Sequence, residues 1–361
     1  MAAEKADKRS PRSPWKLRFL VSLLIALGFW LALRRYIDVV PQTFTLESWT
    51  LPAYLATLLP YFVLRNARWW LLVRALRPQG PGFILTTATG FAGMMWIMLL
   101  PLRLGEFARP LFLAQRSDIS VSESLGTVAL ERVTDGLIAC ACFFLGLWVL
   151  EPTAPHNGAA NTSFESLRMW GLLGTGLLFS ALFVLLAMAR WPTGLGRVVA
   201  APLRLVPPLA RAVEGLTTGL ATGLAALSPL RHLLPFAIVS VAYWAVNAAG
   251  MAILASGCGL PLSYLEATTV MGVLALTLLI PGGPAQFGNF QLGLILGLGL
   301  FLEVGGRADQ TSTFIFCLYL CQLGVGVGLG LAAQLWLRPN WSTLFRRPEV
   351  EATQPDAGST S

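Results

Sequence analysis

Long apolar stretches alternate with short polar connections along most of the chain. These stretches run approximately over residues 17–33, 49–73, 83–100, 125–150, 167–189, 233–256, 264–280, 290–302 and 312–337. Most of them approach the roughly 20 residues that a helix needs to cross the hydrocarbon core of a bilayer. The pattern therefore predicts an all-α, polytopic membrane protein.

Two of the apolar stretches are interrupted in the same way at positions 180 residues apart. The matching residues are Leu100, Pro101, Glu106 and Phe107 in the first break and Ile280, Pro281, Gln286 and Phe287 in the second. The residues expected to break the helices are Pro101, Gly105, Pro281, Gly282, Gly283, Pro284 and Gly288. Lipid cannot satisfy freed backbone N–H and C=O groups, so such breaks persist only where protein buries them or water reaches them. Paired breaks in two halves of a membrane chain are typical of a binding site.

The distribution of Arg and Lys predicts how the segments are oriented. Connections 65–77, 190–231 and 338–347 are rich in Arg, whereas 151–165 and 258–263 contain neither Arg nor Lys. Because basic loops stay in the cytoplasm, the stretch 83–123 should enter and leave from the cytoplasm, and 264–302 from outside. This arrangement is an inverted repeat with two broken or re-entrant hairpins. A plain bundle of eight or nine transmembrane helices is the alternative.

The same pattern divides the chain into a membrane domain and two tails. We expect a cytoplasmic basic tail at 1–16, a membrane domain at 17–337 and a cytoplasmic disordered tail at 338–361. The repeat halves fall at about 49–150 and 229–337, with a linker at about 190–231. No small-residue cleavage pattern follows the first apolar stretch, which therefore predicts an anchor. The expected location is the plasma (inner) membrane, with both termini in the cytoplasm.

Composition agrees with this class and excludes others. Hydrophobic residues make up 55% of the 361 positions and charged residues 12%, and the mean hydropathy is +0.66. A soluble domain of this length does not normally have such a high hydrophobic content and mean hydropathy. The formal net charge of +8 comes from Arg residues spread over helix ends, so we expect no nucleic-acid partner. The spacing of the five Cys and two His residues matches no metal or redox motif, so no metal or cofactor is expected.

Charged side chains concentrate in the first break and in the apolar stretch that follows it. They are Arg103, Glu106, Arg109, Glu131, Arg132 and Asp135. Charges in a bilayer face a protein interior or a water-filled cavity, and Arg presents a planar fork suited to phosphate or carboxylate. We therefore predict that these six residues bind a substrate. The alternative is that the three cations and three anions pair only with one another and hold the hairpin to the next helix.

The second break carries amides in place of charges. Gln286 and Asn289 are predicted to join the binding site, and freed N–H groups at the start of the arm from Phe290 could hold an anionic group. A tight structural turn is the alternative.

Two further groups of residues are given structural roles. Arg65, Arg68, Trp69 and Trp70 are predicted to anchor a helix end at the membrane interface, with substrate contact as the alternative. The glycines Gly324, Gly326, Gly328 and Gly330 are predicted to permit close helix packing. Neither group is expected to decide the function.

Several motifs together resemble a known family. They are Arg65 with Arg68-Trp69, Pro101-x-Arg103-x-Gly105-Glu106-x-x-Arg109, Glu131-Arg132-x-x-Asp135, and the Pro281-x-x-Pro284 to Gly288 turn. The set resembles the transmembrane region of bacterial lysylphosphatidylglycerol synthases and their stand-alone flippase-like relatives, over roughly residues 17–337. Ala285 departs from the resemblance, because the family pattern commonly shows Gly there.

This resemblance implies a domain that moves an aminoacylated phospholipid, or another lipid-linked substrate, between leaflets. Only a short tail follows the last apolar stretch, so the aminoacyltransferase domain is expected to be missing, and synthase activity is not implied. No G-x-x-x-x-G-K-[ST] motif is present, which argues against ATP-driven pumping.

Three functions are therefore open. The first is a flippase-like protein whose partners are the membrane and a phospholipid or lipid-linked substrate. The second is a membrane enzyme that acts on a lipid headgroup, with Glu106 or Asp135 as acid or base. The third is a non-transporting scaffold for a partner enzyme. A homodimer is compatible with each of them.

Overall fold

The computed structural model describes residues 40–100, 105–150, 229–280 and 283–338, together with Gly28, Leu31 and scattered positions between 169 and 225. The first apolar stretch, the stretch at 167–189, the linker and both tails lie wholly or largely outside the described residues. The described helices are α2 (Thr50–Leu76), α3 (Phe83–Leu99), α4 (Ala108–Ala114), α5 (Val121–Val149), α9 (Leu230–Gly257), α10 (Tyr264–Thr277), α11 (Asn289–Leu298) and α12 (Ala308–Leu337), with 3₁₀ turns η3 (Pro284–Gln286) and η4 (Gly305–Arg307). All regular elements in this part of the chain are helical, which confirms the predicted all-α class.

The long helices are suited to a bilayer. Within the described ranges, α5, α9 and the helix that ends at Leu337 are long and apolar enough to cross a membrane by length and composition. α2 has 27 residues, which correspond to about 40 Å at 1.5 Å per residue. That length exceeds the roughly 30 Å of a hydrocarbon core, although α2 is less hydrophobic on average than the other three helices. The protein is an integral membrane protein.

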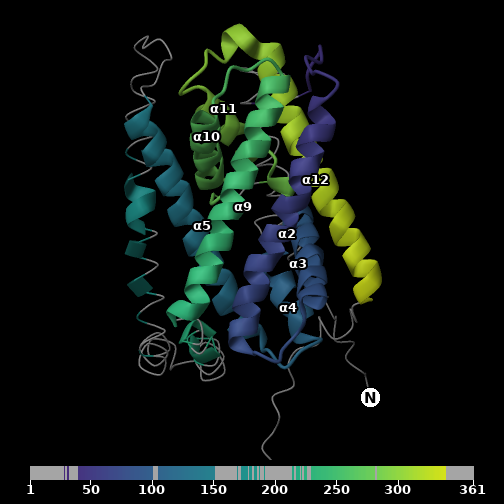
Figure 1. Ribbon diagram of the computed structural model, residues 1–361, viewed down its shortest axis with the longest axis vertical. Helices are drawn as coiled ribbons and strands as arrows, with labels where there is room; N and C mark the ends of the chain where they lie inside the picture. Colours follow the sequence, from purple (N-terminus) through teal and green to yellow (C-terminus); the bar gives the residue numbers. More distant parts are fainter. Residues whose placement is uncertain are drawn as a thin grey trace, which may run out of the picture.

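The shorter helices form two hairpins that open at opposite ends of the molecule. α3 has 17 residues and α10 has 14, so α3 lies at the lower limit of membrane-crossing helices and α10 falls below it. α3 and α4 lie in the lower half of Figure 1, and α10 and α11 lie in the upper half. Both pairs reverse direction inside the molecule, as the charge distribution predicts for re-entrant hairpins.

The two halves are related as an inverted repeat. Displaced by 180 residues, α2 covers positions 230–256, and α9 spans Leu230–Gly257. The contacts between helices also correspond in the two halves. α2 packs on its counterpart α9, and the contact of α3 with α12 corresponds to the contact of α10 with α5. α2 and α9 run in opposite directions in Figure 1, as do α5 and α12. These directions and contacts agree with the predicted inverted repeat.

Local sequence signals start two of these helices. Ser120 accepts a hydrogen bond from the Glu123 N–H at 3.2 Å, and the Glu123 carboxylate accepts one from the Ser120 N–H at 2.9 Å. Ser263 and Glu266 form the same reciprocal pair at the start of α10. Such capping boxes satisfy N–H groups that have no partner within the helix. The first capping box fixes the start of α5, which follows the first hairpin. The second fixes the start of α10, which is the first helix of the second hairpin.

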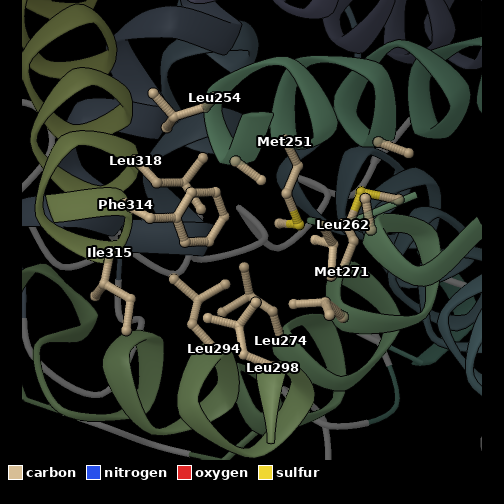
Figure 2. Packing of buried hydrophobic residues seen from close by; sticks show 14 of the residues in the cluster. Met251, Leu254, Leu262, Met271, Leu274, Leu294, Leu298, Phe314, Ile315 and Leu318 are labelled. Carbon is tan, nitrogen blue, oxygen red and sulfur yellow. The ribbon is translucent and has the colours of Figure 1, made fainter. Parts of the chain in front are cut away.

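The apolar core lies mainly in the second half. Figure 2 shows side chains from α9, α10, α11, α12 and the α9–α10 connection packed around the second hairpin: Met251, Leu254, Leu262, Met271, Leu274, Leu294, Leu298, Phe314, Ile315 and Leu318. Cys258 and Cys317 belong to the same cluster as small buried residues. This packing buries the faces of α10 and α11 that meet α9 and α12. The surroundings of the second hairpin are therefore apolar, whereas the buried charged residues lie mainly in the first half.

The predicted glycine packing is correct for two of the four residues on α12. A Cβ on Gly330 would lie 2.8 Å from the carbonyl oxygen of Phe91 on α3, and one on Gly326 would lie 2.7 Å from the methyl group of Met94. Gly324 and Gly328 face open space. Because residues four apart share one helix face, only Gly326 and Gly330 lie in the α3–α12 contact.

We expect Gly330→Ala to destabilise the protein by about 1–3 kcal/mol, because the added methyl group meets α3 backbone that has no room to move. Gly328→Ala is the matched control, and it should stabilise the helix by about 0.5–1 kcal/mol. Thermal unfolding in detergent measures both changes. Equal effects of the two substitutions would contradict the assigned packing face.

Candidate functional site

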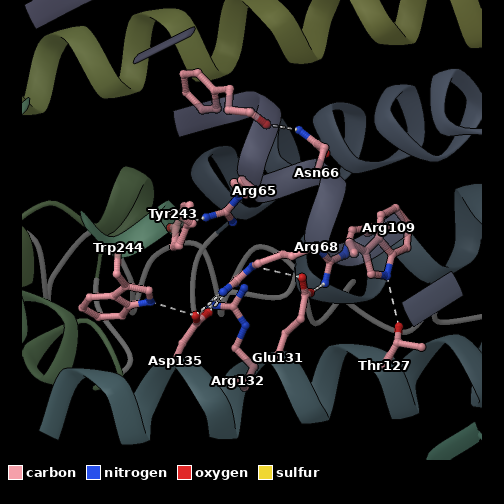
Figure 3. A network of polar contacts seen from close by, with 12 residues as sticks. Arg65, Asn66, Arg68, Arg109, Thr127, Glu131, Arg132, Asp135, Tyr243 and Trp244 are labelled. Carbon is pink, nitrogen blue, oxygen red and sulfur yellow. Dashed lines mark hydrogen bonds and ion pairs between the residues drawn. The ribbon is translucent and has the colours of Figure 1, made fainter. Parts of the chain in front are cut away.

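Glu131 of α5 lies between two arginines from different helices. Arg68 of α2 places its Nε 3.4 Å from Glu131 Oε1, and Arg109 of α4 forms an ion pair with Glu131 Oε2 (Figure 3). The Glu131 and Arg68 side chains are each 1% exposed. Charges this deeply buried are tolerated only where partners replace the lost water. The triad therefore ties α2, α4 and α5 together.

Asp135, one turn further along α5, extends the cluster to the second half. Its two carboxylate oxygens accept hydrogen bonds from Arg68 Nη1 at 2.5 Å and Nη2 at 2.7 Å. Trp244 of α9 donates to the same carboxylate from Nε1 at 3.2 Å. A bidentate Arg–carboxylate pair is strong and directional, so Asp135 joins α2, α5 and α9 at one point.

Aromatic rings cover the two buried guanidinium groups. The Arg109 Cζ lies 4.3 Å from the centre of the Trp69 ring, and the Arg68 Cζ lies 4.6 Å from the centre of the Tyr243 ring. The Trp69 Nε1 donates to the Thr127 hydroxyl at 3.0 Å. Stacking on an aromatic face stabilises a desolvated guanidinium.

The predicted membrane-interface role of Arg68 and Trp69 is therefore wrong. Both side chains are buried, because this face of α2 packs on α5 and α9 and carries the partners of Glu131 and Asp135. Arg74 is exposed further along the same helix, where its guanidinium lies 5.2 Å from the Trp70 ring.

Arg132 is held more loosely than Arg68 and Arg109. Its Nε lies 4.0 Å from Glu106 Oε1, and its Nη1 lies 4.0 Å from Asp135 Oδ2. Both distances exceed hydrogen-bond length, and no described group accepts a hydrogen bond from the Arg132 Nε. With 25% of its side chain exposed, Arg132 keeps N–H groups for another ligand.

A cavity of about 180 Å³ opens beside Arg132 and Asp135. Its walls come from α2, α3, α5, α9, α10, α11 and α12 and from the turn η3. Met98 near the end of α3 and Leu279 after α10 both line it, so the cavity lies where the two breaks approach each other. Its charged and amide side chains are Arg65, Arg132, Asp135, Asn247, Gln286 and Gln322.

The second break directs Gln286 into this cavity through an unusual backbone. Ala285 and Gln286 have φ angles of 55° and 58°, in the left-handed region that L-residues rarely adopt. The Tyr319 hydroxyl on α12 donates to the Ala285 carbonyl oxygen at 3.2 Å and supports this turn. Glycine would adopt the Ala285 conformation without strain, whereas the alanine present here carries a Cβ in that region.

Asn289 closes the hairpin and does not line the cavity. Its side-chain Nδ2 donates to the Ile280 carbonyl oxygen at 2.6 Å, and the residue is 3% exposed. The neighbouring Gly288 N–H donates to the Gln291 side chain at 2.8 Å. These contacts form the tight turn that was the alternative for this segment, and substrate binding by Asn289 stays a prediction.

The structure brings most of the predicted charged residues together. Glu106, Arg109, Glu131, Arg132 and Asp135 form one network, and within it only Arg132 and Asp135 line the cavity. The predicted site residue Arg103 and the predicted breaks Pro101, Pro281 and Gly282 lie outside the described residues.

Sequence reasoning missed four residues of the site: Arg65, Arg68, Tyr243 and Trp244. A signal existed for the two arginines, because they lie three residues apart inside an apolar stretch and so share one helix face. Tyr243 and Trp244 carry no such local signal. Only the contact between α2 and α9 reveals them.

These features define a class: a helical membrane protein built from an inverted repeat, with two broken hairpins around a charged internal cavity. Within this class, the chain belongs to the family described as the lysylphosphatidylglycerol synthase TM region, whose family model matches residues 16–330. The resemblance seen in the sequence is thereby confirmed. No curated protein and no solved structure matches the chain. Membership of this family relates the protein to the handling of lipid headgroups in a membrane.

Proposed function

We propose that this protein moves the headgroup of a phospholipid or another lipid-linked substrate between the two leaflets. The observation that carries the proposal is the charged cavity at the meeting point of two hairpins that open at opposite ends. In repeat-built transporters a site of this kind is exposed alternately to the two sides by movement of one repeat against the other.

The dimensions and chemistry of the cavity suit a headgroup. The cavity volume of about 180 Å³ is more than ten times the roughly 10–15 Å³ that one water molecule needs. Charged and amide groups offer hydrogen bonds, while Met98 and Leu279 on the hairpins keep part of the wall apolar. A polar headgroup can pass through such a space while its acyl chains remain in lipid.

The residues of the site divide into two roles. Arg65, Arg132 and Gln286 are the proposed headgroup contacts, because they line the cavity, whereas Asp135 lines it with both carboxylate oxygens engaged by Arg68. The Arg109–Glu131 pair positions α4 against α5 without reaching the cavity.

The proposal includes a plasma-membrane location with both termini in the cytoplasm. Arg77, Arg116 and Arg338 lie at the end where the first hairpin opens, and Arg116 donates to the Leu337 carbonyl oxygen there. Glu303 and Arg307 lie at the opposite end, between α11 and α12. An excess of arginine at one end supports a cytoplasmic assignment for that end.

Reconstitution into liposomes with tail-labelled fluorescent phospholipids tests the proposed function. We expect the purified protein to expose inner-leaflet label to a membrane-impermeant quencher much faster than empty liposomes do. Arg132→Gln should slow this by about tenfold or more, because it removes a charge-assisted donor. Arg74→Gln, which changes an exposed arginine outside the cavity, should leave the rate unchanged. A wild-type rate equal to that of empty liposomes would reject the function.

A further inference from the structure

We infer that the cavity selects phosphate-bearing headgroups of net negative charge, and that Arg65 is the specificity-determining residue. This inference rests on the proposed function, because it names the substrate class of the same site. It does not follow from the family, whose name refers to a lysyl ester lipid with a net positive headgroup.

The charges that face the cavity do not balance. Among the described residues, its charged lining consists of Arg65, Arg132 and Asp135. Both oxygens of Asp135 are engaged by Arg68, at 2.5 and 2.7 Å, and Arg68 lies behind the cavity wall and is 1% exposed. The carboxylate on the lining is thus compensated by Arg68, and Arg132 lies 4.0 Å from Glu106, which leaves Arg65 as the cation in excess within the described network.

Arg65 is the less compensated of these two. Its Nη1 donates to the Tyr243 hydroxyl at 3.3 Å, and no carboxylate of the described residues lies within 4.0 Å of it. The Tyr243 hydroxyl donates in turn to the Tyr61 hydroxyl at 3.3 Å. This chain orients the Arg65 guanidinium with neutral groups only. A cation held in this way on a partly apolar wall favours an anionic ligand.

Arg132 provides a second fork on the same cavity. Its 4.0 Å separations from Glu106 and Asp135 leave its N–H groups without short hydrogen bonds to either carboxylate. A planar guanidinium matches two phosphate oxygens, so Arg65 and Arg132 together suit a phosphate monoester or diester. The amide of Gln286, which also lines the cavity, can donate to the same group.

A headgroup ammonium finds no equivalent partner here. The only described carboxylate on the lining, Asp135, already binds Arg68 and Trp244. The Tyr243 ring, a candidate for binding a cation on its face, is already covered by Arg68 at 4.6 Å. A cationic headgroup would therefore meet repulsion from Arg65 and Arg132 without a free counter-charge.

The test compares binding of short-chain lipids of different headgroup charge to the full-length protein in neutral detergent. The probes are dioctanoyl phosphatidylglycerol, its lysyl ester and dioctanoyl phosphatidylcholine, and the readout is the shift of the unfolding temperature with lipid concentration. We expect the wild type to bind phosphatidylglycerol at least about tenfold more tightly than the lysyl ester. Arg65→Gln should remove most of this preference, whereas Arg65→Lys should retain part of it. The exposed arginine variant Arg74→Gln is the matched control and should behave as wild type.

Each outcome decides a separate point. Equal or tighter binding of the lysyl ester, or no binding of any probe, would overturn the inference. A preference that persists in Arg65→Gln would overturn the role of Arg65. Because binding is measured without transport, a protein that prefers the anionic lipid but moves no lipid in liposomes contradicts the proposed function alone. The comparison of lipids on the wild type does not depend on any variant folding.

Discussion

Glu131→Gln is expected to lower the stability of the protein by about 3–5 kcal/mol. The glutamine removes the charge that lies between Arg68 and Arg109, while both guanidinium groups remain buried. A buried cation that loses its counter-ion cannot recover its hydration without opening the helix packing. Thermal unfolding in detergent, followed by tryptophan fluorescence, measures the loss.

Glu123→Gln on the same helix is the control. Glu123 also pairs with an arginine, Arg77, at 3.1 Å, but the Arg77 side chain is 45% exposed. An exposed pair contributes only about 0–1 kcal/mol, and glutamine can still close the capping box with Ser120. If the Glu131 and Glu123 variants lost equal stability, the buried triad would not be what holds α2, α4 and α5 together.

The architecture could be predicted because its signals are local or periodic. Apolar stretches of membrane length, the recurrence of Pro101 at Pro281, and arginine-rich connections are each visible in a short window of sequence. Together they predicted two hairpins that open at opposite ends, and α3–α4 and α10–α11 confirm them. The 14 residues of α10 fall below the length of a membrane-crossing helix, which agrees with a re-entrant second hairpin.

The pairing of charges could not be predicted in the same way. The sequence offers as many cations as anions around the first break, but it does not show that Arg68 reaches Asp135 and Glu131. That pairing depends on how α2 is rotated against α5, which is a property of tertiary packing. The same rotation buries Trp69 and leaves Arg74 exposed one turn later.

The second break illustrates a further limit. Gln286 and Asn289 are both amides in one Pro- and Gly-rich segment, yet Gln286 lines the cavity and Asn289 turns back to the Ile280 carbonyl oxygen. The difference arises from the left-handed conformations of Ala285 and Gln286. Composition indicates that the helix breaks, but the direction of each side chain follows from the dihedral angles of the turn.

The two partners of the Arg68–Asp135 pair are expected to affect stability in the same direction and lipid binding in opposite directions. Arg68→Gln should destabilise the protein by about 3–5 kcal/mol, and Asp135→Asn by about 1–3 kcal/mol, because the 17% exposed Asp135 side chain borders the cavity, where water can compensate part of the loss. Arg68→Gln leaves the Asp135 carboxylate uncompensated on the cavity wall, so binding of phosphatidylglycerol should weaken by about tenfold. Asp135→Asn removes that carboxylate, so the same lipid should bind about tenfold more tightly despite the lower stability.

One experiment separates these two effects. The unfolding temperature without lipid measures the stability of each variant, and its shift with dioctanoyl phosphatidylglycerol measures lipid binding. A purely structural role for the pair predicts that both variants bind the lipid more weakly, in proportion to their lost stability. An electrostatic role predicts opposite changes, because Arg68 acts on the cavity only through the charge of Asp135. Weaker binding in Asp135→Asn would therefore show that this carboxylate contacts the headgroup directly, and it would contradict the view that Arg68 neutralises Asp135 from behind the wall.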